Sequence, residues 1–384
     1  MRLSKFLQPS MPPQGDVIHD QRKYGLSMQQ VVEPRDASRA AIPAPTVDWP
    51  RDKTGPFQSR AWQRHWLEHR GVGLESFPIV VDGGATVAPF GRRRIAGLRV
   101  LRLLGSGDSD FNGLITTRAA DAAWDSVVAE LARRRGEWDL LHLHSVAERE
   151  AILPALERHL GRPGVARLYE ACPFIRLADT WTQFIGARKR LRGEVGRWTR
   201  RLEEMGPLTL HSVKAPVPQE VLDVIVEIER DSWKWEHGNA AFKPGSQRDF
   251  LFAVLRDAES PARVWTLNVG SRVAAFGIVL EGATRWCFYL AAYRQEFKNA
   301  GSMLLARLVE AAHDAGCTSF SLLRGDLHYK HDWANESENV YEIVCASNPL
   351  GQLGALAYQA RWRAATSPLI RRVHSVLFRA GDRR

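Results

Sequence analysis

The sequence predicts an α/β protein built from two similar mixed units, and two patterns carry this prediction. Short apolar runs typical of β-strands alternate with segments of helical periodicity along most of the chain. The order strands, helix, strand, helix occurs in residues 51–185 and again in residues 186–350. This repetition indicates an internal duplication of one α/β unit.

The first unit opens with an amphipathic helix in which aromatic residues recur at helical spacing. Asp82-Gly83-Gly84 lies between the first two strands and is typical of a hairpin turn. Trp138–Ser145 has the continuous apolar character of a buried strand. The predicted helices are 57–67, 119–135 and 149–160, and the predicted strands are 77–81, 85–90, 98–104 and 138–145.

The second unit contains three consecutive strands joined by short turns at Gly270-Ser271 and Glu281-Gly282. Gly316 is suited to end the helix that follows, because glycine readily adopts the left-handed conformation at a helix C-terminus. The predicted helices are 179–205, 218–233 and 301–315, and the predicted strands are 208–213, 263–269, 272–280, 285–290, 318–323 and 340–346.

The composition is that of a globular protein, with 45% hydrophobic and 25% charged residues in a chain of 384, a length that accommodates two domains. Residues 1–50 are rich in Pro, Gln, Asp and Arg without periodicity, so we expect a disordered or extended arm. The four cysteines have no CxxC spacing, which argues against a zinc ribbon and fits a reducing cytosol.

The charge and hydropathy favour a cytoplasmic protein that meets anions. No secretory signal is recognisable at the N-terminus, and no apolar run is long enough for a membrane span. The formal net charge of +10 predicts attraction to CoA phosphates, lipid phosphates, nucleic acid or acidic glycans, without choosing among them.

The first candidate site is a loop and helix start after the third strand of the second unit. A helix N-terminus offers unpaired N–H groups and positive dipole charge, which suit a pyrophosphate, and Gly301 allows close approach to the backbone. A simple helix cap is the alternative. The predicted cofactor-binding residues are Tyr293, Arg294, Lys298, Asn299, Ala300, Gly301 and Ser302.

The second candidate is the run LLRGDLHYKHDW at Leu322–Trp333, which gathers titratable groups beside two aromatic residues. Acyl transfer from a thioester needs a base, a group that holds the acceptor, and a proton for the leaving thiolate. Asp326 could be the base, Tyr329 the proton donor, and Lys330 a partner for an anionic group or for Asp326. A salt bridge of Asp326 with Arg324 or Lys330 that merely closes the turn is the alternative.

These segments resemble a known family. LLRGDLHYKHDW, preceded by AAYRQEFKNAGSMLLARLVEAAHDAG, resembles the CelD/BcsL group of GNAT acetyltransferases, which are similar to the FemAB-like transferases with two GNAT-like units. The resemblance covers most of the chain after residue 55. It includes PFQSRAWQRHW as an opening helix, LRVLRLLGSGDSDFNGLI as a strand and Asp-aromatic turn, RKRLRGEVGRWTRRLEEMGPL as a basic helix, and RDSWKWEHGNA as a Trp-Lys segment.

The resemblance implies two tandem GNAT-like lobes, each a mixed and mostly antiparallel sheet flanked by helices, with the transferase in residues 186–350. It implies acetyl-CoA as the acyl donor and a role in exopolysaccharide, holdfast or envelope synthesis. Where related chains have Ser-Pro-Gly before the helix, this chain has Asn299-Ala300-Gly301 and lacks the proline that pre-sets the turn. The family's functional positions correspond to Arg324, Gly325, Asp326, Tyr329 and Lys330, to Trp233 and Lys234, and to Gly301.

Two further basic segments have two interpretations each. The helix around Arg188–Arg201 is either a solvated face or a phosphate site, and its RxxxR spacings suit a cyclic dinucleotide. The tail, residues 351–384, has apolar residues at a spacing of three to four beside arginines after Pro368. It is either a basic amphipathic helix on an anionic membrane or a helix docked on the protein's own core.

The histidines and tryptophans complete the candidate residues. His142 and His144 alternate along a predicted strand, but a third ligand is not evident and HExxH is absent, so we expect no metal site. Most tryptophans are expected in the core, while Trp233, Trp235 and Trp333 could stack on sugar rings.

The preferred prediction is a cytoplasmic N-acyltransferase that moves acetyl from acetyl-CoA to an amino sugar or polysaccharide precursor, without a metal and with peripheral membrane contact through its tail. A FemAB-like aminoacyl transferase that uses charged tRNA and a non-enzymatic nucleotide-binding regulator are the alternatives; a nucleic-acid-binding protein ranks last. The predicted catalytic residues are Asp326, Tyr329 and Lys330, and the predicted substrate-binding residues are Trp233, Lys234, Arg324 and Trp333.

Overall fold

The structure is a computed structural model that describes residues 55–161, 164–177, 180–325 and 327–366, without the side chains of Trp233 and of residues 364–366. The predicted N-terminal arm and the part of the predicted tail beyond residue 366 therefore lie outside the described residues. Among the described helices, none has both the length and the apolar character that a membrane span requires.

The strands form one large sheet and one small sheet. The bounds are β1 Glu75–Ser76, β2 Ile79–Val81, β3 Thr86–Ala88, β4 Phe90–Ile95, β5 Leu98–Leu103, β6 Ile115–Thr116, β7 Leu140–Ala147, β8 Val165–Arg176, β9 Leu208–Lys214, β10 Ala262–Val269, β11 Arg272–Glu281, β12 Arg285–Tyr293, β13 Ser319–Ser321 and β14 Glu336–Ala346. The large sheet has the order β1-β4-β5-β7-β14-β8-β13-β12-β11-β10-β9, and the small one β2-β3-β6. Most neighbours are antiparallel, as predicted, whereas β5–β7 and β12–β13 are parallel.

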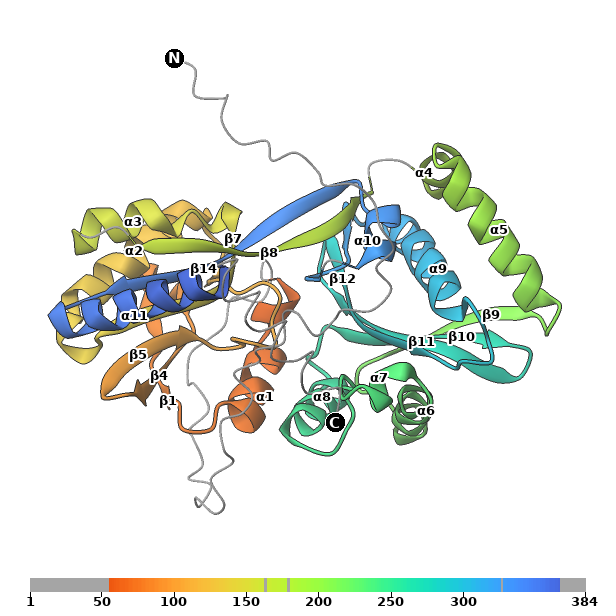
Figure 1. The fold of residues 1–384 in the computed structure, drawn as a ribbon, viewed down its shortest axis with the longest axis horizontal. Helices are drawn as coiled ribbons and strands as arrows, with labels where there is room; N and C mark the ends of the chain where they lie inside the picture. The colour runs from red at the N-terminus through yellow and green to blue at the C-terminus, as the bar shows by residue number, and fades with distance from the viewer. Residues whose placement is uncertain (1–54, 162–163, 178–179, 326, 367–384) are drawn as a thin grey trace, which may run out of the picture. The chain divides into compact units, whose positions relative to one another are not determined.

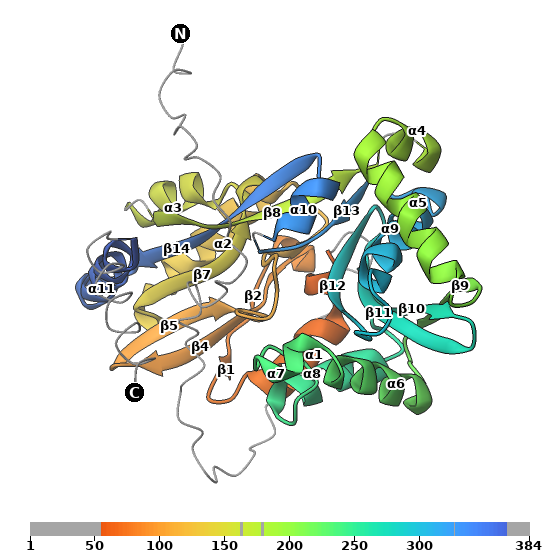
Figure 2. The same cartoon turned by 45° about the vertical axis from the view of Figure 1, so that its right-hand side comes forward.

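The helices cover both faces of the large sheet (Figure 1). Their bounds are α1 Arg60–Arg70, α2 Ala120–Arg133, α3 Ile152–Leu160, α4 Trp181–Gly186, α5 Lys189–Glu203, α6 Gln219–Arg230, α7 Trp233–Glu236, α8 Ser246–Arg256, α9 Ala300–Asp314, α10 His328–Trp333 and α11 Pro349–Thr366. In the second half of the chain, α4, α5 and α9 lie on one face, and α6, α7 and α8 on the other (Figures 1 and 2).

Side chains of β11 show why both faces are covered. Phe276 and Ile278 point into the core beneath α1, α6 and α8, whereas Ala275 and Val279 point into the core beneath α5 and α9. Successive side chains of a strand alternate between faces, so a strand buried on both faces reads as a continuous apolar run. This is the pattern by which the sequence predicted the strand.

The predicted helix 179–205 is two helices, α4 and α5. Arg188 breaks it, because its backbone has the non-helical angles φ −111° and ψ 73°. Its guanidinium turns back onto Phe184, donating to the carbonyl at 3.2 Å and lying 3.9 Å from the ring centroid. A capping box between Thr180 and Gln183 begins α4.

The strand β14 pairs with strands that are distant from it in the sequence. It pairs along most of its length with β7 and β8, which come from the first half of the chain. The predicted assignment of 340–346 to the second unit therefore differs from the pairing, and the two halves share one continuous sheet. The strand β8 was not predicted, and it joins the halves by pairing with β14 and with β13.

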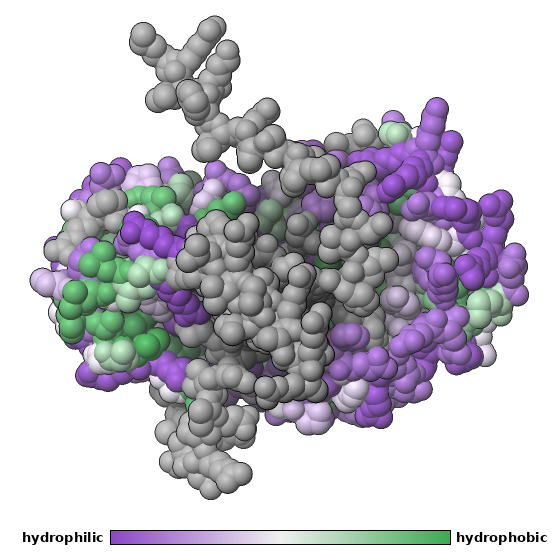
Figure 3. All heavy atoms as spheres, in the orientation of Figure 1, coloured by the Kyte–Doolittle hydropathy of each residue, from purple (hydrophilic) through white to green (hydrophobic). Residues whose placement is uncertain are grey.

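The helix α11 packs on β5, β7 and β14. Two glycines allow the close approach: a Cβ on Gly351 would lie 1.8 Å from the Asp139 carbonyl oxygen, and one on Gly354 would lie 2.7 Å from Leu98. The opposite side of α11 exposes Leu350, Leu353 and Leu356, and Figure 3 shows an apolar area over this helix.

Candidate active site

The candidate site begins where β12 and β13 diverge. Their parallel pairing covers only the residues opposite Ser319–Ser321. The strand β12 continues to Tyr293, whereas the chain after β13 turns toward β8, and the Leu322 N–H donates to the Pro173 carbonyl at 2.9 Å. Leu323 has the unusual φ of 60°, which directs the following segment away from β12.

Arg324 is the residue that ties this segment to the first half of the chain. Its Nε donates to the Asp110 carboxylate at 2.5 Å and its backbone N–H to the same carboxylate at 3.2 Å. The two side chains are 16% and 14% exposed, so the pair is largely shielded from water. Burial lowers the pKa of Arg324, but pairing with Asp110 outweighs it, and the net pKa is raised.

Lys330 and Glu170 lie in the same charged cluster. Lys330 is 4% exposed, and its Nζ donates to the carbonyls of Leu323, at 3.1 Å, and Arg324. Burial lowers the pKa of Lys330, while Asp110 and Glu170 oppose that change. Burial raises the pKa of Glu170, against the opposing effects of Arg324 and Lys330. The cluster thus contains a carboxylate whose pKa burial raises, which makes it a stronger base than an exposed glutamate.

The helix α1 holds the loop that presents Asp110. Trp62 donates its indole N–H to the Ser109 hydroxyl at 2.9 Å, and Trp66 donates to the Asp108 carboxylate at 2.7 Å. From β12, the hydroxyl of Tyr289 reaches the Asp108 carbonyl at 3.4 Å. Residues distant in sequence therefore fix Asp110 beside Arg324.

Aromatic and histidine side chains border the cluster on β7 and β8. The His144 ring lies 4.2 Å from the Tyr169 ring, and the Arg324 guanidinium lies over Tyr169 at 5.4 Å. Burial, with the nearby Arg324 charge, lowers the pKa of His144 to about 3, so this ring is neutral at physiological pH. The His142 ring contacts a carboxylate, with its Nε2 2.7 Å from Glu342 Oε1.

The predicted donor loop has a backbone suited to an anion. Asn299 has the left-handed φ of 74° and begins α9 without a side-chain cap, which leaves first-turn N–H groups for another partner. Asparagine tolerates this conformation better than most residues, so it takes the place of a glycine here. Gly301 lies against the Tyr293 ring, and a Cβ there would be 2.8 Å from Tyr293 Cδ1.

The charged residues of this loop have different roles. Lys298 is exposed, as a phosphate partner must be. The guanidinium of Arg294 is occupied, since it donates to Asp231 at 2.7 Å, Glu227 at 2.9 Å and the Val273 carbonyl at 3.0 Å. Arg294 therefore holds the loop onto α6 and β11. Ala300 is buried, and Ser302 lies in the first turn of α9.

The predicted acceptor residues are only partly brought together. Lys234 donates to the Ala291 carbonyl on β12 at 2.8 Å, and burial lowers its pKa. Tyr329 is 39% exposed, and partial burial of the ring raises its pKa to about 12. Trp333 is 2% exposed in the core beneath α9, which corrects the prediction that it stacks on a sugar. Asp326 and the side chain of Trp233 lie outside the described residues.

The sequence analysis did not predict Glu170 or Asp110 as individual functional residues. Glu170 lies within β8, which was not predicted because alternating charged residues interrupt its apolar run. A carboxylate in the middle of a strand is the signal that could have found it. Asp110 was noticed only as part of a turn, and its partner is 214 positions away in the chain.

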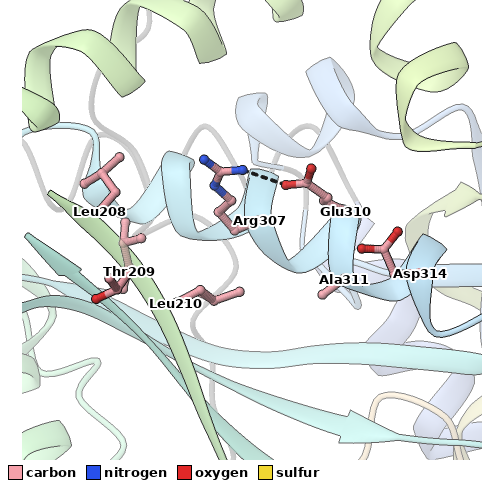
Figure 4. A pocket seen from close by; sticks show the side chains of 8 residues that line it. Leu208, Thr209, Leu210, Arg307, Glu310, Ala311 and Asp314 are labelled. Carbon is pink, nitrogen blue, oxygen red and sulfur yellow. Dashed lines mark hydrogen bonds and ion pairs between the residues drawn. The ribbon is translucent and has the colours of Figure 1, made fainter.

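Two cavities lie outside this cluster. One, of roughly 300 Å³, lies between β9 and the second half of α9, where Arg307 and Glu310 pair at 2.8 Å (Figure 4). The other, of roughly 390 Å³, lies between the start of α5 and α10. Arg190 of the predicted phosphate-binding helix pairs there with Asp332. Neither cavity contains a residue of the predicted catalytic set.

Part of the chain that contains this site matches the model of a known protein family. Residues 189–331 match the model of a family described as an acetyltransferase (GNAT) domain. The match runs from α5 into α10 and includes the donor loop, Arg324 and Lys330. It confirms the predicted GNAT domain in the second half of the chain and the predicted acyltransferase class. No curated protein has a detectable match to the chain.

Solved structures extend the similarity over both halves. FemX has a TM-score of 0.57 at 11% identity, covering 80% of this chain and 96% of that one. The C-terminal domain of a proposed lysylphosphatidylglycerol synthetase from Agrobacterium fabrum has 0.52 at 15%, covering 80% and 93%. L-PGS from Bacillus licheniformis has 0.51 at 14%, covering 77% and 90%. At these identities the similarity concerns the fold, and it supports the predicted two-lobed architecture.

Proposed function

We propose that this protein is an acyl-CoA-dependent N-acyltransferase that transfers acetyl to an amino sugar or polysaccharide precursor, as the CelD/BcsL resemblance implies. The observation that carries the proposal is the partly buried cluster of Asp110, Glu170, Arg324 and Lys330 beside the divergence of β12 and β13. Arg324 and Lys330 lie within the segment that matches an acetyltransferase model, and Asp110 and Glu170 join them from the first half of the chain.

The cluster and the nearby Tyr329 on α10 together offer the groups that the reaction needs. The neutral amine of the acceptor attacks the thioester carbonyl, and Glu170 accepts the proton that the nitrogen loses as the C–N bond forms. The tetrahedral intermediate expels the thiolate as the amide forms, and the thiolate takes a proton from Tyr329. Return of one proton from Glu170 to Tyr329 through solvent restores both groups. A tyrosine whose pKa is about 12 is protonated at neutral pH, as a proton donor must be. Asp110 and Arg324 hold the segment in place and are positioning residues.

The donor part of the proposal assigns the pyrophosphate of acetyl-CoA to the first turn of α9. Asn299 and Gly301 shape that turn, and Lys298 adds an exposed positive charge. Helix N-termini bind phosphate through free N–H groups and the helix dipole.

Gly301→Ala is expected to weaken acetyl-CoA binding at least tenfold, about 1.4 kcal/mol. The new methyl group would lie 2.8 Å from the Tyr293 ring, so either the ring or the first turn of α9 must move. Calorimetric titration of the purified full-length chain with acetyl-CoA measures the change. Gly193→Ala on α5 is the matched control, because a Cβ there meets nothing within 4 Å, and its affinity is expected to equal that of the wild type.

A wild-type protein that binds no acetyl-CoA would contradict the assignment of acetyl-CoA as the acyl donor. Transfer that depends on charged tRNA and is lost after ribonuclease treatment would then favour the FemAB-like aminoacyl transferase, a candidate also suggested by the similarity to FemX. Nucleotide binding without any transfer would favour the regulator. Equal acetyl-CoA affinities of Gly301→Ala and the wild type would be compatible with acetyl-CoA as the donor. They would contradict the assignment of its pyrophosphate to the first turn of α9.

The membrane is the setting in which we propose the enzyme acts, at the cytoplasmic face. The exposed leucines of α11 are followed by a tail with Arg371, Arg372 and Arg379, and apolar and cationic groups together favour an anionic bilayer. Replacing Leu350, Leu353 and Leu356 by serine is expected to reduce binding to phosphatidylglycerol vesicles at least tenfold in flotation assays, a change of about 1.4 kcal/mol. Val72→Ser, at another exposed apolar position, should bind as the wild type does. Undiminished binding of the triple variant would contradict the role of α11.

A further inference from the structure

A group of potential metal ligands lies on α1, outside the candidate active site. His65, Glu68 and His69 each offer a ligand atom, and these three atoms lie within 4.8 Å of one another. Residues three and four apart share one face of a helix, which is why the two histidines, at positions i and i+4, converge. The His65 Nδ1 and Glu68 Oε2 atoms are 3.0 Å apart.

We propose that His65, Glu68 and His69 bind a zinc ion, with water completing a tetrahedral shell. Two ligand atoms about 2.0–2.1 Å from one tetrahedral zinc lie about 3.3 Å from each other, so the spacing of His65 and Glu68 needs only a small adjustment. The site goes beyond the acyltransferase function and does not depend on it.

Asp257, at the C-terminal end of α8, is a carboxylate that contacts one of the proposed ligands from outside the metal shell. Its carboxylate lies 2.8 Å from the other ring nitrogen of His65, Nε2. A carboxylate in that position favours the tautomer with the proton on Nε2, so that a metal between Nδ1 and Glu68 Oε2 would take the place of their present 3.0 Å contact. Arg64 also pairs with Asp257, so the Asp257 carboxylate is shared between a guanidinium and the His65 ring.

The metal would act as a structural brace. The helices α1 and α8 lie side by side (Figure 1) and come from opposite halves of the chain. The same α1 holds the Asp108–Ser109 loop through Trp62 and Trp66. Zinc on α1 would therefore stabilise the support of the candidate active site without taking part in chemistry.

Calorimetric titration of tag-free, chelator-treated full-length protein with Zn²⁺ tests the site. We expect one ion per chain, and at least a tenfold loss of affinity in His69→Ala. Asp257→Asn should lose about 10- to 100-fold, as removal of such a supporting carboxylate does elsewhere. His211→Ala, at an exposed histidine on β9, is the control and should bind as the wild type does. The four cysteines are buried and so do not compete for the ion.

A second readout separates binding from misfolding. Zinc should raise the unfolding temperature of the wild type but not of His69→Ala, because a ligand that binds only the folded state stabilises it. If His69→Ala does not fold, the exposed Glu68→Gln takes its place with the same expectation. A wild type that binds no zinc, or a folded ligand variant that binds it as tightly as the wild type, overturns the proposal.

Discussion

Asp110→Ala is expected to lower the free energy of unfolding by about 3–5 kcal/mol, the usual cost of breaking a buried ion pair from one side. The change leaves the guanidinium of Arg324 charged, 16% exposed and without its carboxylate partner. Urea unfolding followed by tryptophan fluorescence and circular dichroism measures the loss.

An exposed pair supplies the matched control for that measurement. Arg272 and Glu296 also form a guanidinium–carboxylate pair, but their side chains are 57% and 46% exposed. Glu296→Ala is therefore expected to cost no more than about 1 kcal/mol. The double variant Asp110→Ala/Arg324→Met should recover much of the loss, since no uncompensated charge remains. A loss in Asp110→Ala no greater than that in Glu296→Ala would show that the pair does not hold the two halves together.

Glu170→Gln is expected to lower kcat by about 10²- to 10⁴-fold with little change in KM for acetyl-CoA, because an amide cannot accept the acceptor's proton. Steady-state transfer to an amine acceptor, followed by release of free thiol, measures both constants. Glu203→Gln on the exposed side of α5 is the control and should leave kcat unchanged.

The pH profile distinguishes a base from a structural residue. Burial raises the pKa of Glu170 above the ordinary 4.5, and a base works only when deprotonated. Activity should therefore fall as the pH drops through that raised pKa, and Glu170→Gln should lack this acid limb. A kcat within about threefold of the wild type would instead move the base to Asp326, the position that the sequence favoured.

Much of the fold was predictable because it rests on local periodicity. The run 272–280 was recognisable as a strand, and Gly301–Ala315 as a helix. The predicted start of each lies within about one residue of its start in the structure. The strand β8 was not recognised, because Arg167, Glu170 and Arg176 interrupt its apolar pattern. Its burial depends on β14, which is more than 150 positions later in the chain.

The residues of the candidate site also fall into two groups, those that local sequence predicts and those that it does not. Arg324, Tyr329 and Lys330 were identified from one short run, and the donor loop from a helix start. Trp333 was misassigned because the same run gives no sign of which aromatic ring faces inward, and packing under α9 decided that. Glu170 and Asp110 could not be assigned from local sequence, since each acquires its role from a distant partner.

Local sequence was enough to predict the α/β class, the repeated order of elements, the helix start that suits an anion, and the segment that carries Arg324 and Lys330. These features depend on residues a few positions apart, where periodicity and backbone preference act directly. Three features became visible only in the folded chain: β14 joins β7 and β8, Asp110 faces Arg324, and Glu170 lies in the same partly buried cluster. The reason is physical: burial and charge pairing are properties of neighbours in space, and sheet formation brings together residues that the chain order keeps apart.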